Sequence, residues 1–125
     1  MPIKMTVDHK RRFVEAVAAG EVSLADIEEF LDGVVVAEAL SYRKLFDGSA
    51  SYGKYNDEEI MRLAARISAY SSLGQRGALA LVTPPQYYEV AARFLNLDRP
   101  ERPGRIFLDA GEARRWLDAQ PDVKD

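Results

Sequence analysis

The feature that most constrains the fold is a short, uninterrupted apolar run at residues 78–82, which reads ALALV. Gly77 precedes this run, and the turn-forming residues Thr83, Pro84 and Pro85 follow it. Such a run is typical of a strand that is buried on both faces, as strands of a parallel sheet are when helices cover both sides. The sequence therefore predicts an α/β protein with helices packed on a sheet.

Periodicity elsewhere in the chain predicts the remaining elements. Apolar and polar residues alternate where strands are expected, and apolar residues three and four positions apart mark helical faces. The further strands are expected at residues 3–7, 12–18, 42–47 and 105–108, and helices are expected to begin near Ser23, Asp57, Pro85 and Asp109. The short turn after the first strand predicts an antiparallel hairpin, and right-handed crossovers make the later strands parallel. We predict a five-stranded mixed sheet, with an N-terminal antiparallel hairpin followed by parallel βα units, and about four helices.

Length, charge and composition restrict the class of protein. A chain of 125 residues is expected to form one domain over residues 1–125, with a frayed tail at residues 121–125. A net charge of −3 and a pI near 5.2 argue against nucleic-acid binding. The chain has no cysteine, which excludes disulfides and thiol chemistry. It also lacks a signal peptide and an apolar run of the roughly 20 residues that a membrane span needs, so a cytoplasmic protein is expected.

Charged side chains are expected mostly at the surface. Helical periodicity places Glu28 on the solvent side of the first helix and points Arg62 and Arg66 outward from the second. For Arg43 and Lys44, an ion pair at the edge of the core is favoured over an anion-binding role. The arginines around residues 93–105 alternate with acidic residues, which indicates a solvated charged loop.

Several segments together resemble a known group of proteins. These are the opening hairpin through Asp8-His9, Val22-Ser23-Leu24-Ala25-Asp26-Ile27, Tyr42-Arg43-Lys44-Leu45-Phe46-Asp47, Ala80-Leu81-Val82, Ala91-Ala92-Arg93-Phe94, and the ending from Arg105-Ile106-Phe107 through Glu112-Ala113 to Trp116-Leu117. They resemble small uncharacterised bacterial proteins of the SpoIIAA-like superfamily. That superfamily shares its fold with STAS domains and is related to CRAL-TRIO lipid-binding domains. The resemblance implies a SpoIIAA-like fold and a non-enzymatic regulatory or protein-interaction module.

The resemblance also implies a phosphorylation site. STAS antagonists carry a phosphorylatable serine in a turn that follows a strand and leads directly into a helix. Ser49 lies at a similar place here, with Ser51 as a second candidate phospho-acceptor. Residues 52–56 separate this turn from the expected helix, so the serine departs from the helix N-terminus that would steady a phosphate. The alternative is an ordinary polar loop.

A second candidate site is a crevice at the carboxyl ends of the parallel strands, where ligands of open α/β sheets usually bind. Its candidate residues follow two of the strands and are Asp47, Tyr52, Tyr55, Tyr87 and Tyr88. The four tyrosines would suit an apolar ligand or a protein interface, in which tyrosine is enriched. The alternatives are that half of the tyrosines belong to the core and that Asp47 only begins an Asx-turn.

The sequence contains no arrangement of base, nucleophile and oxyanion donors that would indicate an enzyme. His9 is the sole histidine and lies in the expected hairpin turn, so we predict no catalytic residue, no metal site and no cofactor. The leading hypothesis is a protein-interaction module, and the alternative is a binder of a small apolar or lipid-like ligand in the crevice. A homodimer is also expected, because an exposed strand edge needs cover.

Overall fold

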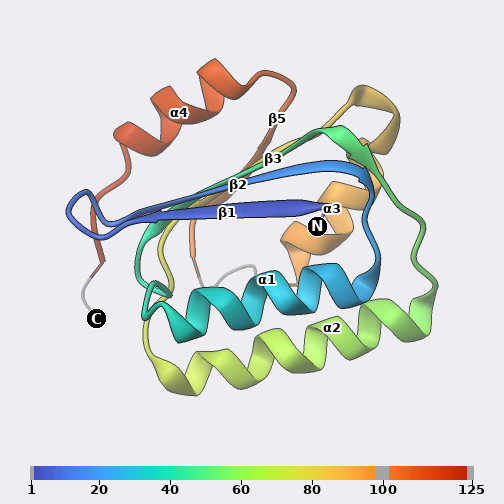
Figure 1. Ribbon diagram of the computed structural model, residues 1–125, viewed down its shortest axis with the longest axis horizontal. Coiled ribbons are helices and arrows are strands. Elements are labelled where there is room, and N and C mark those ends of the chain that lie inside the picture. The colour runs from blue at the N-terminus through green and yellow to red at the C-terminus, as the bar shows by residue number, and fades with distance from the viewer. Residues whose placement is uncertain (1, 98–101, 124–125) are drawn as a thin grey trace.

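The computed structural model describes residues 2–97 and 102–123 and contains strands and helices in the order that the sequence predicts (Figure 1). The strands are β1 (Ile3–Asp8), β2 (Phe13–Glu21), β3 (Arg43–Tyr52), β4 (Leu79–Val82) and β5 (Gly104–Phe107). The α-helices are α1 (Leu24–Val36), α2 (Asp57–Tyr70), α3 (Tyr88–Asn96) and α4 (Ala110–Asp118), and short 3-10 helices cover Ser71–Leu73 and Pro85–Tyr87.

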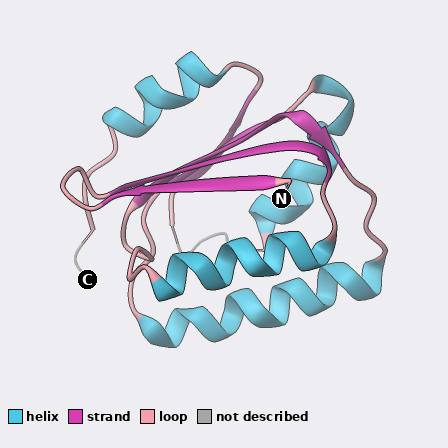
Figure 2. Ribbon diagram, viewed as in Figure 1, coloured by secondary structure: helices cyan, strands magenta, loops and turns pink. Residues whose placement is uncertain are grey.

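The five strands form one mixed sheet in the order β1-β2-β3-β4-β5. β1 is antiparallel to β2, and every later pair of neighbours is parallel. Helix α4 lies on one side of the sheet, whereas α1, α2 and α3 lie on the other (Figure 2). The predicted α/β fold, with an antiparallel hairpin followed by parallel βα units, is therefore confirmed.

Local side-chain bonds start the helices where the sequence places them. Ser23 and Asp26 form a capping box at the start of α1, in which each side chain binds the backbone of the other residue. Asn56 and Glu59 make the same reciprocal pair at α2. At α4, Asp109 accepts a hydrogen bond from the backbone N–H of Glu112. These bonds satisfy backbone N–H groups that a helix start leaves without partners.

Strand β3 is longer than predicted. The sequence predicts a strand at residues 42–47 followed by a polar loop, but β3 continues through Gly48 and Ser49 to Tyr52. Its extension pairs with the end of β2, with Ala19, Gly20 and Glu21 opposite residues 50–52 and a register shift just before them. The small polar residues of this extension suggest a loop. They form a strand because β2 continues to Glu21 and provides hydrogen-bond partners for their backbone groups.

The side of the sheet that faces α4 is closely packed. Its core combines residues of β3, β4 and β5, the residue just before β4 and two residues of α4. These are Leu45, Ala78, Ala80, Val82, Phe107, Ala113 and Leu117, all of them buried. Alanine dominates at the contact between α4 and β4, and small side chains let a helix approach a strand closely. Arg114 of α4 also pairs with Glu15 of β2. Helix α4 is therefore in direct contact with the strands on this side of the sheet.

An ion-pair network joins α1 to α2, and it corrects the expectation that Glu28 lies on the solvent side. The side chain of Arg62 is 63% exposed, so its outward orientation is as expected, and that of Arg66 is partly exposed. Glu28 is only 8% exposed and accepts hydrogen bonds from Arg62 at 2.7 Å and from Arg66 at 3.2 Å. Asp32 accepts bonds from Arg66 and from the Tyr70 hydroxyl. The Arg62 hydrogen bond, with the charges of both arginines, holds the pKa of Glu28 below its ordinary value, although burial acts in the opposite direction. Periodicity within one helix does not reveal that a second helix covers its polar side.

The chain after α4 lies against the start of the sheet. Arg12 donates a hydrogen bond to the carbonyl oxygen of Val123, and Arg43 lies 3.4 Å from a carboxylate oxygen of Asp122. The frayed tail that the sequence predicts spans residues 121–125, of which 124 and 125 lie outside the described residues. The same holds for residues 98–101 of the predicted charged loop.

Candidate functional site

A cavity of about 170 Å³ lies between the sheet and the three helices α1, α2 and α3. Most of its lining is apolar and comes from five elements: Ile27, Phe30, Leu31 and Val34 of α1, Leu63 and Ile67 of α2, Val90, Ala91 and Phe94 of α3, Phe46 of β3, and Leu79, Leu81 and Val82 of β4. In Figure 1, α2 lies on the side of α1 that is away from β1. The cavity lies on the side opposite α4.

Alternation along the strands explains which side chains reach the cavity. Lys44, Phe46 and Gly48 of β3 line it, whereas Leu45 between them belongs to the core under α4. Phe46 makes an edge-to-face contact with Phe30 of α1, with ring centroids 5.4 Å apart. A strand turns successive side chains to opposite faces, so one sequence supplies both a packed core and a cavity wall.

Tyrosines surround the end of the cavity near the carboxyl edge of the sheet. Tyr52, Tyr55 and Tyr87 all line it, and Tyr52 is 50% exposed, so the cavity reaches the surface there. The Tyr55 hydroxyl donates a 2.7 Å hydrogen bond to the Val22 carbonyl oxygen, and its ring packs edge-on against Phe94. Burial raises the pKa of Tyr55 to about 12, and the nearby charge of Asp26 acts in the same direction.

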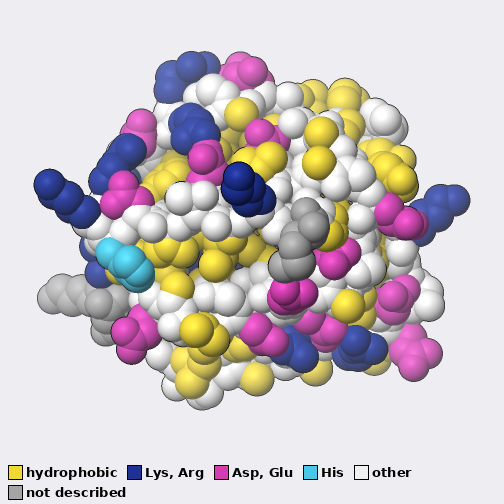
Figure 3. All heavy atoms as spheres, in the orientation of Figure 1, with side chains coloured by type: hydrophobic (Ala, Val, Ile, Leu, Met, Phe, Trp, Pro, Cys, Tyr) yellow, Lys and Arg dark blue, Asp and Glu magenta, His cyan; other side chains and the backbone are white. Residues whose placement is uncertain are grey.

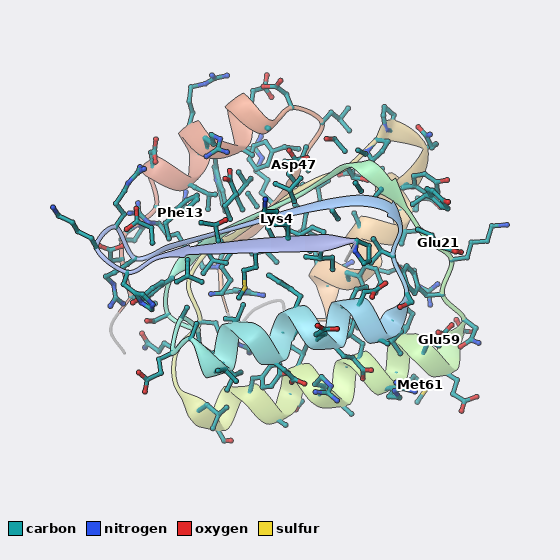
Figure 4. All side chains as sticks on the ribbon, viewed as in Figure 1. Lys4, Phe13, Glu21, Asp47, Glu59 and Met61 are labelled. Carbon is teal, nitrogen blue, oxygen red and sulfur yellow. The ribbon has the colours of Figure 1, made fainter. Side chains whose placement is uncertain are left out.

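The structure separates Asp47 and Tyr88 from these tyrosines. Asp47 points to the α4 side of the sheet in Figure 4, and it accepts hydrogen bonds from the backbone N–H and hydroxyl of Ser49. This is the Asx-turn arrangement that the sequence leaves open as the alternative. Tyr88 is half exposed and does not line the cavity. Three of the five predicted crevice residues therefore lie together.

The two candidate serines lie in different surroundings. Ser49 is exposed on β3, on the side of Asp47, and its hydroxyl donates to the Asp47 carboxylate at 2.7 Å. Ser51 is half-buried, lines the cavity and donates to the Gly48 carbonyl oxygen. Neither serine lies at a helix start, because α2 begins at Asp57. The phospho-acceptor role of Ser49 and Ser51 stays a prediction.

Three cationic side chains line the opposite end of the cavity, and sequence reasoning did not assign them to a site. Lys44 is 4% exposed and its ammonium donates to the carbonyl oxygens of Leu40 and Tyr42, both at 2.6 Å. Arg76 is 5% exposed and Arg102 is half-buried. Arg76 precedes β4 and Arg102 precedes β5, and Lys44 lies at the start of β3. Sequence reasoning assigned Lys44 to a peripheral ion pair and Arg102 to a solvated loop, and no local pattern unites residues from three separate segments.

Backbone contacts hold these cations in place. Arg76 donates to the carbonyl oxygen of Ile67, and Arg102 donates to that of Gly77. The N–H of Gly77 in turn binds the carbonyl oxygen of Leu40, which also accepts the Lys44 bond. A side chain at Gly77 would collide with the backbone of Tyr42, so only glycine fits this position. The cationic end is therefore built from segments that are fixed to one another.

Other features offer little chemistry. The His9 ring nitrogen Nδ1 lies 2.8 Å from the Tyr42 hydroxyl oxygen. This pair lies near the start of β3, at the opposite end of that strand from Tyr52. Among residues 2–97 and 102–123, no group of three or more His, Cys, Asp or Glu side chains is placed to hold a metal ion. Figure 3 shows acidic and basic side chains interspersed on the face it presents. No helix in the described part of the chain is long and apolar enough to cross a membrane.

Comparisons with known proteins agree with the fold. No protein-family model matches the sequence, and no curated protein is similar to it. A solved structure of an uncharacterised DUF3478-family protein from Shewanella loihica PV-4, described as having a SpoIIAA-like fold, matches with a TM-score of 0.58 at 19% identity. The match covers 92% of this chain and 91% of that one. This chain has the SpoIIAA-like fold.

A second solved structure that matches is that of an anti-sigma factor antagonist from Mycobacterium paratuberculosis. It has a TM-score of 0.58 at 16% identity, and the match covers 93% of this chain and 94% of that one. At such identities the comparisons show the fold alone. The fold that the sequence resemblance implied is confirmed.

Proposed function

We propose that this SpoIIAA-like protein binds a small apolar ligand in the cavity between the sheet and helices α1, α2 and α3. The observation that carries the proposal is the cavity itself, about 170 Å³ with a largely apolar lining. Protein interiors are normally packed with few voids larger than a water molecule. An apolar cavity of about 150 Å³ in another protein stays dry and takes up benzene, so this volume suits a comparable group.

The arrangement of the mouth supports the same function. Tyr52 at the surface and the half-buried Tyr55 and Tyr87 give an aromatic path from solvent to the interior. Gly53 lies beside them, and a side chain there would collide with the Tyr55 hydroxyl. Aromatic and apolar linings with few polar groups are common in small-molecule sites. The ligand is held by burial of its apolar surface, without covalent chemistry.

The test is a titration with the neutral probe 1-octanol, followed by calorimetry and by thermal unfolding. We expect wild-type protein to bind the probe and to unfold at a higher temperature in its presence, because a ligand that binds the folded state stabilises it. Ala91→Leu fills the cavity and should abolish both effects. Ala65→Leu adds the same side chain at an exposed position of α2 and should leave them unchanged. Absence of binding by wild type would contradict the proposal.

A second candidate is the protein-interaction module that the sequence resemblance implies. Exposure of Ser49 supports it, because a phosphoryl group there would add charge beside Asp47 without disturbing the core. The solved anti-sigma factor antagonist shares the fold. Mass spectrometry of protein isolated from its own host tests this candidate: a phosphoryl group on Ser49 or Ser51 supports it, and unmodified serines that also fail to accept phosphate from host extract contradict it. A homodimer through the free edge of β1 stays a prediction.

A further inference from the structure

We propose that two copies of this chain pair through their β1 strands, antiparallel and centred on Thr6, so that one continuous sheet crosses a two-fold axis. This inference specifies the homodimer that the sequence leads us to expect, and it does not depend on ligand binding in the cavity. The observations behind it are the position of β1 at the edge of the sheet and the pattern of charges along this strand.

Half of the backbone groups of β1 point away from the sheet. Among the described residues β1 pairs with β2 alone, and it lies at the front of Figure 1. Pro2 accepts a hydrogen bond from the N–H of Ala19, and in an antiparallel pair bonded and non-bonded residues alternate. The even-numbered residues of β1 therefore bond to β2, whereas Ile3, Met5 and Val7 direct their N–H and C=O groups outward. Such an edge is a template for a further strand.

The outward-facing groups restrict how a second copy can pair with this edge. Two antiparallel strands related by a two-fold axis bond to each other only where outward-facing residues of both copies lie opposite one another. This condition places the axis beside a single residue of β1. With the axis at Thr6, Met5 of each copy lies opposite Val7 of the other, and these two residues exchange hydrogen bonds in both directions.

Charge distinguishes this register from its neighbours. Lys4 and Asp8 are exposed on the same face of β1. With the axis at Thr6, Lys4 lies opposite Asp8 of the second copy, which favours pairing, whereas an axis at Lys4 or at Asp8 would bring like charges together. An axis at either neighbour of Thr6 would leave Lys4 opposite Thr6 or Lys10. Asp8 can take part because its bond from the Arg11 N–H needs only one of the two carboxylate oxygens.

The other face of the edge has a groove that can receive the second copy. This groove, of about 270 Å³, lies between β1 and α1, and Met5 and Phe30 are among its lining residues. Two carboxylates, Asp26 and Glu29, also border it in the first half of α1. Since Met5 and Val7 pack toward α1, Val7 of the second copy would lie on this side, opposite Met5. The pairing would thus join apolar side chains on one face and opposite charges on the other.

Single cysteines test which residues face each other, because the chain contains no cysteine of its own. Opposite residues that share no main-chain bonds have Cα atoms about 4.5 Å apart, a distance that a disulfide can span. Thr6→Cys should therefore give a disulfide-linked dimer under mild oxidation. Lys4→Cys, exposed on the same face, should not, because its two copies would lie about 14 Å apart along the strands. Cross-linking at residue 4 in preference to residue 6, or at neither, would overturn the proposal.

Sedimentation equilibrium of the full chain measures the dimer itself. Wild type should dimerise, and Lys4→Glu should weaken the dimer by at least about fivefold, because it places like charges opposite each other at two symmetric positions. Asp8→Lys should have the same effect, and the double variant should regain wild-type association. Lys54→Glu, at an exposed position outside β1, is the matched control and should change nothing. A wild type that stays monomeric at millimolar concentration, or a dimer that neither single substitution weakens, would overturn the proposal.

Discussion

The two faces of the sheet differ in how they are covered. On the α4 face, alanines and leucines of one helix and three strands pack until Ala80, Ala113 and Leu117 are 0% exposed. On the other face, three helices cover the sheet but leave a cavity of about 170 Å³ among larger side chains. Both faces are apolar, so burial alone does not distinguish a structural face from a binding face. The packing does.

The helices also differ in how far ion pairs attach them. Helix α4 rests on the sheet through apolar contacts and one ion pair, between Arg114 and Glu15. Helix α2 buries Ile60 and Leu63 and is also tied to α1 by a network of four side chains, Glu28, Asp32, Arg62 and Arg66. Ion pairs between two helices fix their separation without filling the space beneath them. A helix held at its outer side can therefore span a cavity that a close-packed helix would close.

Removal of a leucine from each face should give the largest difference. Leu117→Ala deletes a fully buried side chain and should lower the free energy of unfolding by about 2–5 kcal/mol. Leu81→Ala removes a side chain that already borders the cavity and should cost roughly 1–2 kcal/mol, because fewer contacts are lost. Urea denaturation measures both values. Equal losses would show that the two faces are equally packed.

Addition of volume gives the converse test. Ala113→Leu forces a larger side chain into a place without space and should destabilise by about 1–3 kcal/mol. Ala91→Leu, on α3, places the same atoms in the cavity and should leave stability within about 0.5 kcal/mol of wild type or raise it, as cavity filling often does. Thermal unfolding of both variants without ligand is the measurement. A destabilised Ala91→Leu beside an unaffected Ala113→Leu would reverse the comparison.

The ionic attachment of α2 predicts a dependence on pH. The folded-state pKa of Glu28 is lowered, so its contribution to stability is present above the ordinary value of 4.5 and is lost as pH falls through the lowered pKa. Glu28→Gln should therefore cost about 1–2 kcal/mol at neutral pH, and this cost should shrink in acid and at high salt. Glu29→Gln, exposed on the same helix, is the control. A cost that is independent of pH would contradict the ionic attachment.

The sequence predicts the fold well because the fold follows from local periodicity. The apolar run at residues 78–82, the capping pair of Ser23 and Asp26, and the alternation in the first hairpin all correspond to observed elements. The extension of β3 to Tyr52 does not follow from local pattern, because its polar residues are strand only through pairing with β2. Periodicity indicates which face of its own helix or strand a residue occupies. Whether a segment forms a strand also depends on pairing with another strand that is distant in the sequence.

The candidate site is predictable only at its tyrosine end. The rule that loops after parallel strands share one edge places Tyr52, Tyr55 and Tyr87 together, as observed. The cationic end is formed by residues 44, 76 and 102, which are distant in sequence. Sequence patterns alone predict Lys and Arg side chains at the surface, because these residues are mostly exposed in proteins. Their burial is a property of the assembled sheet, so it was visible only once the topology was known.

The smallest expected effect concerns Tyr55. This residue lines the cavity, but a hydrogen bond to Val22 and a ring contact with Phe94 fix its position. Its pKa is raised to about 12, so the folded state retains the phenolic proton and loses stability as pH rises from 10 through about 12. Tyr55→Phe should cost about 1 kcal/mol at neutral pH through loss of the hydrogen bond to the Val22 carbonyl oxygen. An ultraviolet titration of the folded protein should lose its highest-pH tyrosine step in this variant, whereas Tyr88→Phe, at an exposed position, should retain it. If Tyr55 instead titrated with the exposed tyrosines, water would reach the inner part of the cavity, and the apolar character assigned to this face would be wrong.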